Sequence, residues 1–482
     1  MLTKDDFITK TLEQIRWKKA HDSVRKELSD HIEDQKNAFL DMNMDENEAE
    51  ERAVQEMGDP VEVGALLDNS YRPRTDKGLI FGGVMLTLVG ILISCILDFG
   101  AFAQPTYLIG FAIALPIAFI IPFFLDVSTI YKNIWWAVGI YIIFLLWAAV
   151  FAYNTRVLIR LVTYSAFMMP PLYTALMFRM RTKGYLGFVI SFVLLCVMTA
   201  LQFSMSGGIA FTLTSYGICV IMSVYAVMKG WCGGKIRPLG MMAICGVLMG
   251  WYVLTTPMNY YILSRLKRMF VPSSDPLGYG WQTLQARDFL SRSVFLGRGA
   301  GESAINGIPG YHTDYALTSL IHRFGYIAAI LLGVVMMIFI VKLCLKTRKQ
   351  TSQLARSTSY AVILIYAVNT LIFFLVNLGI IGSISTCPAF IFGGKSAMVV
   401  SAFLLGIIVS TNRNGSIISD NTAVKSLFKV EKFENKLVIT IGEDEKNENI
   451  RFNFPRLAIS SPRHYPRRIH SCKYDYNLQI FP

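Results

Sequence analysis

The chain has 482 residues, of which 53% are hydrophobic, and its mean hydropathy is +0.45. This excludes an ordinary soluble globule, because so much apolar surface needs lipid to cover it, and it predicts a polytopic membrane protein. The net charge of +13 does not predict a nucleic-acid partner, since the basic residues are scattered along the edges of apolar segments. The 8 cysteines contain no CxxC motif, so no metal site or disulfide framework is expected.

Residues 1–77 are predicted to form a small cytoplasmic helical domain. Apolar residues recur at helical spacing within an acidic segment, at Val24, Leu28, Ile32 and Phe39. The strings HIEDQK at 31–36 and MGDP at 57–60 resemble the permease prefix domain found ahead of some bacterial membrane proteins. That resemblance implies docking or regulation and no chemistry.

Residues 78–413 contain apolar runs close to ~20 residues long, the length that spans a bilayer as a helix. The runs lie near 79–97, 106–125, 133–153, 157–179, 184–203, 207–228, 238–256, 324–345, 359–382 and 394–412. We therefore predict an all-α polytopic membrane protein with about ten transmembrane helices, each of which satisfies its own backbone hydrogen bonds.

The basic connections of this body predict its orientation. Residues 179–183, 229–237 and 342–356 carry Lys and Arg and fall on one side of the membrane. By the positive-inside rule that side is cytoplasmic. Both termini are then cytoplasmic, the protein lies in the bacterial plasma membrane, and 257–323 is an extracellular loop. Residues 414–482 are predicted to be a polar cytoplasmic tail, with strands at 436–441 and 449–454.

The extracellular loop is the longest polar interruption of the membrane body, and such loops usually carry function. It contains three short motifs in order: Gly280-Trp281-Gln282, Gly297-Arg298-Gly299 and His312-Thr313-Asp314. Asp314 stands just before an apolar run, at the rim of the membrane body. A carboxylate there is a candidate functional group, and a helix N-cap is its alternative, structural role.

Together with the stretches 265–272 and 388–396, these motifs resemble the SEDS proteins, the FtsW/RodA/SpoVE group. The resemblance spans roughly 78–412 and implies a SEDS-type fold. SEDS proteins polymerise peptidoglycan glycan strands from lipid II during bacterial elongation, division or sporulation. The resemblance therefore implies a peptidoglycan glycosyltransferase that works beside a class B penicillin-binding protein.

Glycan polymerisation requires the C4 hydroxyl of one lipid-linked disaccharide to attack the anomeric carbon of another while an undecaprenyl pyrophosphate leaves. A carboxylate that accepts the hydroxyl proton typically contributes roughly 10²–10⁴ in rate, and the resemblance places the functional aspartate of the family at Asp314. Cationic side chains, with Mg²⁺ or Mn²⁺, would neutralise the pyrophosphate. The candidate substrate-binding residues are Arg265, Lys267, Arg268, Trp281, Gln282, Arg298, His312, Thr313, Lys395 and Ser396.

Departures from the family pattern leave two alternative functions open. His322, Arg323 and Ser204 stand where the family usually carries acidic residues, which favours a catalytically silent SEDS scaffold or sensor. The same departures are consistent with a weaker or differently coupled enzyme, in which His322→Glu with Arg323→Glu would raise activity or partner response. The second alternative is a lipid-linked precursor flippase or transporter. It would need charged or broken-helix sites near the bilayer midplane, whereas the polar residues here concentrate in the outer loop.

Overall fold

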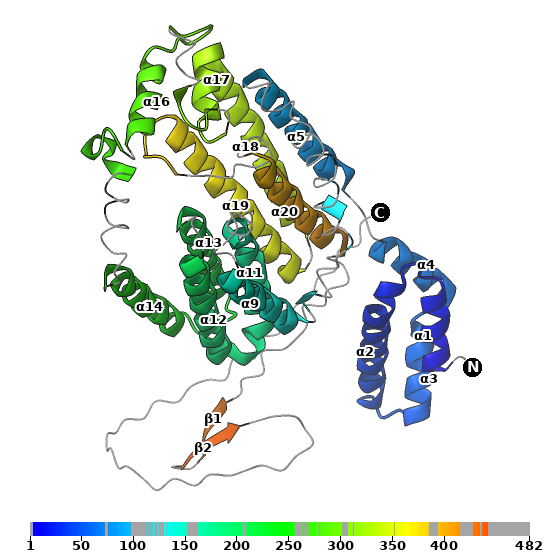
Figure 1. The fold of residues 1–482 in the computed structure, drawn as a ribbon. Helices are drawn as coiled ribbons and strands as arrows, with labels where there is room; N and C mark the ends of the chain where they lie inside the picture. Colours follow the sequence, from blue (N-terminus) through cyan, green and yellow to red (C-terminus); the bar gives the residue numbers. More distant parts are fainter. Residues whose placement is uncertain are drawn as a thin grey trace, which may run out of the picture. The chain divides into compact units, whose positions relative to one another are not determined.

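A computed structural model gives the fold (Figure 1). It describes residues 3–72, 76–97, 133–151, 162–205, 209–255, 269–278, 280–300, 307–311, 313–350, 352–384, 394–414, 428–433 and 436–441, with single positions between 112 and 131 and at 264 and 267. The chain divides into two units, 1–425 and 426–482. The first unit is helical, as the sequence predicts for an all-α protein.

Four helices form the N-terminal segment and share a hydrophobic cluster of their own. They are α1 (Lys4–Glu13), α2 (His21–Leu40), α3 (Glu46–Glu56) and α4 (Pro60–Tyr71). The predicted stripe of Val24, Leu28 and Ile32 is buried in this cluster. Asp59 caps α4 by accepting a hydrogen bond from the Glu62 amide at 3.2 Å. Pro60 follows at the first helical position, where its missing N–H leaves no hydrogen bond unmade.

The membrane body contains eleven α-helices within the described residues. These are α5 (Lys77–Leu97), α9 (Ile134–Phe151), α11 (Met169–Met180), α12 (Gly184–Met205), α13 (Ile209–Met228), α14 (Ile236–Thr255), α16 (Trp281–Ser291), α17 (Ala316–Phe324), α18 (Tyr326–Arg348), α19 (Gln353–Asn377) and α20 (Gly394–Asn414).

Five described segments are long and apolar enough to cross a membrane. They are Lys77–Leu97, Val162–Ser204, Ala210–Met228, Tyr326–Arg348 and Gln353–Asn377. Shorter apolar helices cover Ile134–Ala148, Ile236–Leu248 and Met398–Arg413. The predicted count of about ten spanning helices is not confirmed over the described part of the chain. The run at 106–125 lies largely outside it, and in the run at 157–179 the helix α11 begins only at Met169, ahead of two prolines.

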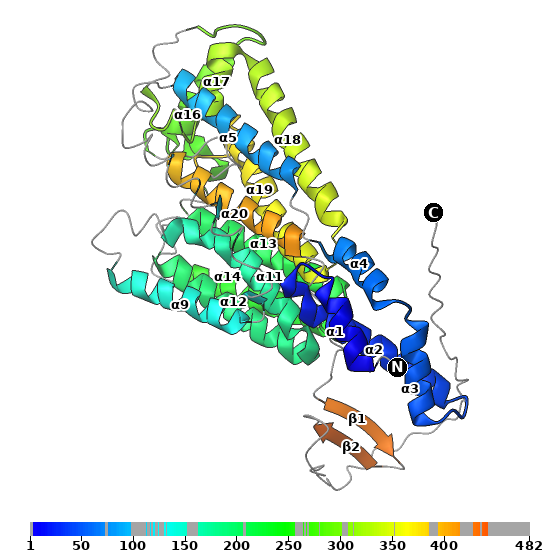
Figure 2. The same ribbon diagram turned by 90° about the vertical axis from the view of Figure 1, so that its right-hand side faces the viewer.

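Helix α19 lies at the centre of the body, between α18 and α20 on one side and α11 and α13 on the other (Figures 1 and 2). Its residues contribute to both large hydrophobic clusters. Two of its buried polar groups bond to α20: the hydroxyl oxygens of Ser359 and Thr411 lie 2.8 Å apart, and the Tyr366 hydroxyl donates to the Ser401 carbonyl at 2.6 Å. A helix that packs against four neighbouring helices is a rigid support for the loop at its end.

The second unit contains a two-stranded antiparallel hairpin, β1 (Phe428–Phe433) and β2 (Lys436–Ile441). The strand predicted at 436–441 is confirmed. Its partner in the hairpin is 428–433, and the second predicted strand, 449–454, lies outside the described residues.

Candidate active site

Helix α16 lies in the polar segment between α14 and α17, and a glycine sets its entry. The Gly280 amide donates to the Asp275 carbonyl at 3.1 Å. A Cβ at this position would lie 2.0 Å from the carbonyl oxygen of Pro272, so only glycine fits the close backbone approach. This approach fixes the first turn of α16, which carries Trp281 and Gln282.

A tight turn presents Asp314 ahead of α17. The amides of Thr313 and Tyr315 both donate to the Gly310 carbonyl at 2.9 Å. Gly310 has φ +77°, a conformation that side chains other than glycine adopt only with strain. An added Cβ there would lie 3.6 Å from Asp314 Oδ2. The carboxylate is therefore held over Gly310, partly buried, on a turn with a defined backbone.

The residues at the start of α17 show whether Asp314 is the N-cap of this helix. The N-cap residue is Tyr315, which makes no side-chain cap hydrogen bond. The Thr318 amide, which lacks a partner inside the helix, donates instead to Asn377 Oδ1 at 3.0 Å. Asn377 Nδ2 also donates to the Asp314 carbonyl at 2.9 Å. Asp314 is thus not the N-cap residue of α17.

Tyr315 lies beneath the turn in a small hydrophobic cluster with Ala286, Phe289 and Val376. Its hydroxyl lies 3.4 Å from Thr283 Oγ1. Burial raises the pKa of Tyr315, and the nearby charge of Asp314 raises it further, while hydrogen bonds from Ser383 and Thr283 oppose the shift. The tyrosine therefore stays protonated at neutral pH, within electrostatic reach of the Asp314 carboxylate.

Ser383, which follows α19, connects Tyr315 to α16. Its hydroxyl donates to Gln282 Oε1 at 3.0 Å. Arg287 of α16 donates to the Gly379 carbonyl at 2.7 Å. The ends of α16, α17 and α19 thus meet around Asp314, and Gln282 is the predicted site residue that this network includes.

The other predicted residues fall into three groups. Thr313 lies in the Asp314 turn and Trp281 is half-buried at the start of α16, next to Gln282. Lys267 and Arg298 are exposed. Lys395 and Ser396 lie in the first turn of α20, where the backbone alone is described, and Arg265, Arg268 and His312 lie outside the described residues.

His322 and Arg323 have structural contacts that the sequence analysis did not anticipate. His322 is fully buried, with Nδ1 3.2 Å from Ser293 Oγ and its ring edge-on to Phe289. Arg323 donates to the Ile96 carbonyl at 2.9 Å, at the C-terminal end of α5. A buried histidine cannot meet an acidic partner in solution, and a cation at a helix C-terminus is stabilising. At both positions the residue that replaces an acidic one makes packing contacts at the base of the loop.

Sequence reasoning missed Tyr315, Ser383 and Asn377. Asn377 had a usable signal, because a polar amide at the end of an apolar span is costly unless it has a specific partner. Tyr315 and Ser383 had none, since an aromatic residue beside a motif and a serine after a helix are common.

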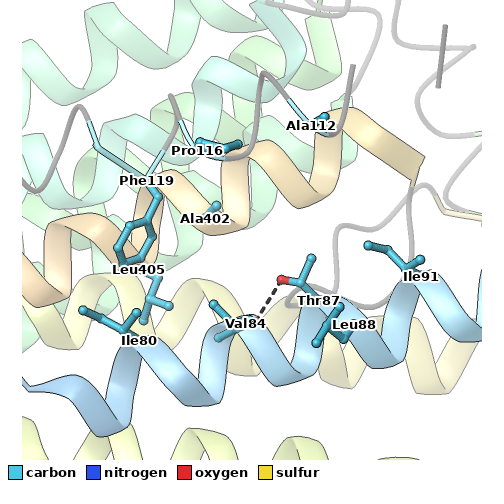
Figure 3. A pocket seen from close by; sticks show the side chains of 11 residues that line it. Ile80, Val84, Thr87, Leu88, Ile91, Ala112, Pro116, Phe119, Ala402 and Leu405 are labelled. Atoms are coloured by element: carbon cyan, nitrogen blue, oxygen red, sulfur yellow. Dashed lines mark hydrogen bonds between the residues drawn. The ribbon is translucent and has the colours of Figure 1, made fainter. Parts of the chain in front are cut away.

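An apolar cavity of about 400 Å³ lies between α5 and α20 (Figure 3). Its labelled lining comes from three segments: Ile80, Val84, Thr87, Leu88 and Ile91 of α5, Ala402 and Leu405 of α20, and Ala112, Pro116 and Phe119. Its one lining hydroxyl, Thr87, already donates to the Gly83 carbonyl at 2.8 Å. The described lining residues therefore offer no acid–base group, and they suit a hydrocarbon chain.

Residues 84–416 match the FtsW/RodA/SpoVE family model, described as "Cell cycle protein". The chain is 23% identical over 234 residues to "Probable peptidoglycan glycosyltransferase FtsW" of Trichlorobacter lovleyi, covering 48% of this chain and 58% of the relative. It is 26% identical over 178 residues to "Peptidoglycan glycosyltransferase MrdB" of Escherichia coli, covering 35% and 46%. The matched segment therefore spans about half the length of these curated relatives.

A solved structure shares the fold. That structure is described as "Structural coordination of polymerization and crosslinking by a peptidoglycan synthase complex". The TM-score is 0.53 at 14% sequence identity, with 71% of this chain and 98% of that chain covered. The family match extends over well more than half of the chain and includes the loop around Asp314. This protein therefore belongs to the FtsW/RodA/SpoVE family of multi-pass membrane cell cycle proteins.

Proposed function

We propose that this protein is a peptidoglycan glycosyltransferase that polymerises lipid II at the outer face of the bacterial plasma membrane. The observation that carries the proposal is the placement of Asp314. Its backbone is held by Gly310 and Asn377 while another residue occupies the N-cap of α17. A carboxylate on a rigid turn, outside the capping position, is suited to proton transfer.

In the proposed reaction Asp314 accepts the proton of the C4 hydroxyl as that oxygen bonds to the anomeric carbon of the second disaccharide. The bond from that carbon to the pyrophosphate oxygen breaks, and undecaprenyl pyrophosphate leaves with its electron pair. Lys267 and Arg298, with Arg265 and Arg268, are the proposed cationic partners of the pyrophosphate. The apolar cavity between α5 and α20 supports a substrate with a long hydrocarbon chain.

A divalent cation fits the described part of this site as a partner of the substrate. Among the described residues no group of three His, Cys, Asp or Glu side chains could hold a metal ion. Mg²⁺ characteristically binds one or two carboxylates together with substrate phosphates. We therefore propose that Mg²⁺ or Mn²⁺, when bound, neutralises pyrophosphate charge and is held chiefly by the pyrophosphate oxygens.

The proposed partner is a class B penicillin-binding protein. The solved complex that shares this fold is named as a peptidoglycan synthase complex that coordinates polymerization with crosslinking. Polymerisation by this chain would supply the glycan strands that such a partner crosslinks.

The test is polymerisation of lipid II by the purified protein, with and without a class B penicillin-binding protein. Asp314→Asn keeps the size of the side chain and removes its proton-accepting carboxylate, so we expect a loss of at least ~10²-fold. Asp288→Asn is the matched control, because Asp288 is an exposed carboxylate of the same loop that pairs with Arg292 at 2.7 Å. We expect this control to keep wild-type activity.

Full activity of Asp314→Asn would contradict the proposed base. A wild-type protein that binds the partner and polymerises nothing would instead favour the scaffold function.

A further inference from the structure

Asn377 is the last residue of α19 and is fully buried. Its amide makes two contacts with the segment 59–63 residues earlier in the chain: Oδ1 accepts from the Thr318 amide at 3.0 Å, and Nδ2 donates to the Asp314 carbonyl at 2.9 Å. Thr318 Oγ1 also donates to the Asn377 carbonyl at 2.7 Å. The side chain thus bridges both sides of the turn that carries Asp314.

These contacts require an amide. The Thr318 amide needs an acceptor and the Asp314 carbonyl needs a donor, and asparagine supplies both on one short side chain. Asn377 Oδ1, which comes from α19, accepts from the Thr318 amide in the first turn of α17, as an N-cap side chain would. Helix α17 has 9 residues, too few to be stable without outside support.

We propose that Asn377 is the positioning residue for Asp314, through which the transmembrane helix α19 sets the place of the carboxylate. This inference rests on the proposed function. Asn377 acts through the backbone of the turn and touches no reacting atom. Reacting groups must be held closely, because a misplacement of about 1 Å can cost ~10²-fold in rate.

Two variants test the role. Asn377→Leu removes both contacts, and we expect kcat for lipid II polymerisation to fall by ~10-fold or more while KM changes by less than ~2-fold. In the Asp314→Asn background the same change should cost less than ~2-fold, since a residue that acts through Asp314 has nothing left to position. A full additional loss in that background would overturn the inference.

Asn377→Asp gives a pH signature that a general structural role would not produce. The carboxyl group introduced by this change can still donate to the Asp314 carbonyl when it is neutral, whereas the ionised group cannot. Burial favours the neutral form. We expect the activity of the variant relative to wild type to rise as pH is lowered. A ratio of variant to wild-type activity that does not change with pH would count against the role. Asn377→Asp is the decisive variant if Asn377→Leu does not insert into the membrane.

Asn369→Leu is the matched control. Asn369 is also a buried amide of α19, and its Nδ2 donates to the Ile365 carbonyl at 2.9 Å, one turn earlier in the same helix. Asn377 makes the equivalent bond to Phe373 at 2.9 Å. The control therefore removes the intrahelical bond without the bridge to the turn. We expect it to keep kcat within ~2-fold of wild type, and an equal loss in both variants would contradict a specific role of Asn377.

Hydrogen exchange separates this inference from the proposed function. The Thr318 amide should lose protection in Asn377→Leu and keep it in Asn369→Leu, whether or not the protein polymerises lipid II. An inactive wild-type protein would end the proposed function only. Unchanged protection of Thr318 in Asn377→Leu would overturn the positioning role in an active or an inactive protein.

Discussion

The imidazole of His322 occupies the contact between α17 and the segment that follows α16. Its Nδ1 lies 3.3 Å from the Phe289 carbonyl, and the Gly299 amide donates to the His322 carbonyl at 2.8 Å. A Cβ on Gly299 would lie 2.5 Å from the ring. The glycine of the Gly297-Arg298-Gly299 motif therefore makes room for this histidine. Gly299, from one of the loop motifs, and His322, which departs from the family pattern, therefore pack against each other.

This packing reverses the expectation for acidic substitutions here. His322→Glu would place a carboxylate in a fully buried site, and an uncompensated buried charge costs about 3–5 kcal/mol. We expect a large fall in thermal stability in detergent and a loss of activity that follows it. Arg323→Glu, tested alone, should remove the contact with the Ile96 carbonyl and cost less stability than His322→Glu, because Arg323 is only partly buried. A His322→Glu protein with wild-type stability and higher activity would restore the original expectation.

At the scale of elements, helix ends in this protein are joined by polar contacts between helices. Asp76 accepts from the Gly78 amide at 3.0 Å at the start of α5, and its carboxylate lies 2.7 Å from Lys346 Nζ of α18. Arg323 binds the carbonyl of Ile96 near the other end of α5. Helix α5 is thus held at both ends.

The Asp76–Lys346 pair predicts a pH effect. Burial raises the pKa of Asp76, but the hydrogen bond and charge of Lys346, together with hydrogen bonds from the Leu79 and Gly78 amides, lower the pKa overall. The folded pKa is below the unfolded value of about 3.9. The pair therefore contributes stability above that value and loses it as pH falls through the folded pKa. Because Lys346 is half-exposed, the contribution should be at most ~1 kcal/mol.

The measurement is thermal unfolding of Asp76→Asn against wild type in detergent. Asparagine keeps a cap acceptor and loses the charge, so the difference in Tm should be present at pH 7 and shrink below about pH 4. Lys346→Met should give a similar loss that does not add to that of Asp76→Asn. Additive losses would show that the two residues act independently.

At the scale of the whole molecule, the proposed chemistry requires the Asp314 turn to face outside and the basic connections to face the cytoplasm. Ser291 at the end of α16 and Lys183 between α11 and α12 are both exposed and test this directly. In a background without the 8 native cysteines, Ser291→Cys should react with an impermeant thiol reagent added outside, and Lys183→Cys should not. The opposite pattern would invert the orientation.

Features that depend on neighbouring residues could be predicted from the sequence. The apolar runs predicted a helical membrane body, the stripe in 21–40 predicted a buried face, and the loop motifs led to Asp314 and Gln282. The first two follow from composition or from the period of a helix over a few turns, and the third follows from the resemblance of the loop motifs to the SEDS family. The number of spanning helices did not follow, because apolar runs do not show where one spanning segment ends: the segment Val162–Ser204 covers parts of two predicted runs, 157–179 and 184–203.

Contacts between distant parts of the chain could not be predicted in this way. Asn377 meets Thr318 across 59 residues, Ser383 meets Gln282 across 101, and Arg323 meets Ile96 across 227. Nothing in local spacing encodes such pairs, since they form only when helices pack. That packing settled whether Asp314 caps its helix, whether His322 faces water, and which residue holds the turn. A hydrogen bond between remote residues depends on where whole helices lie, and that position is a property of the assembled body.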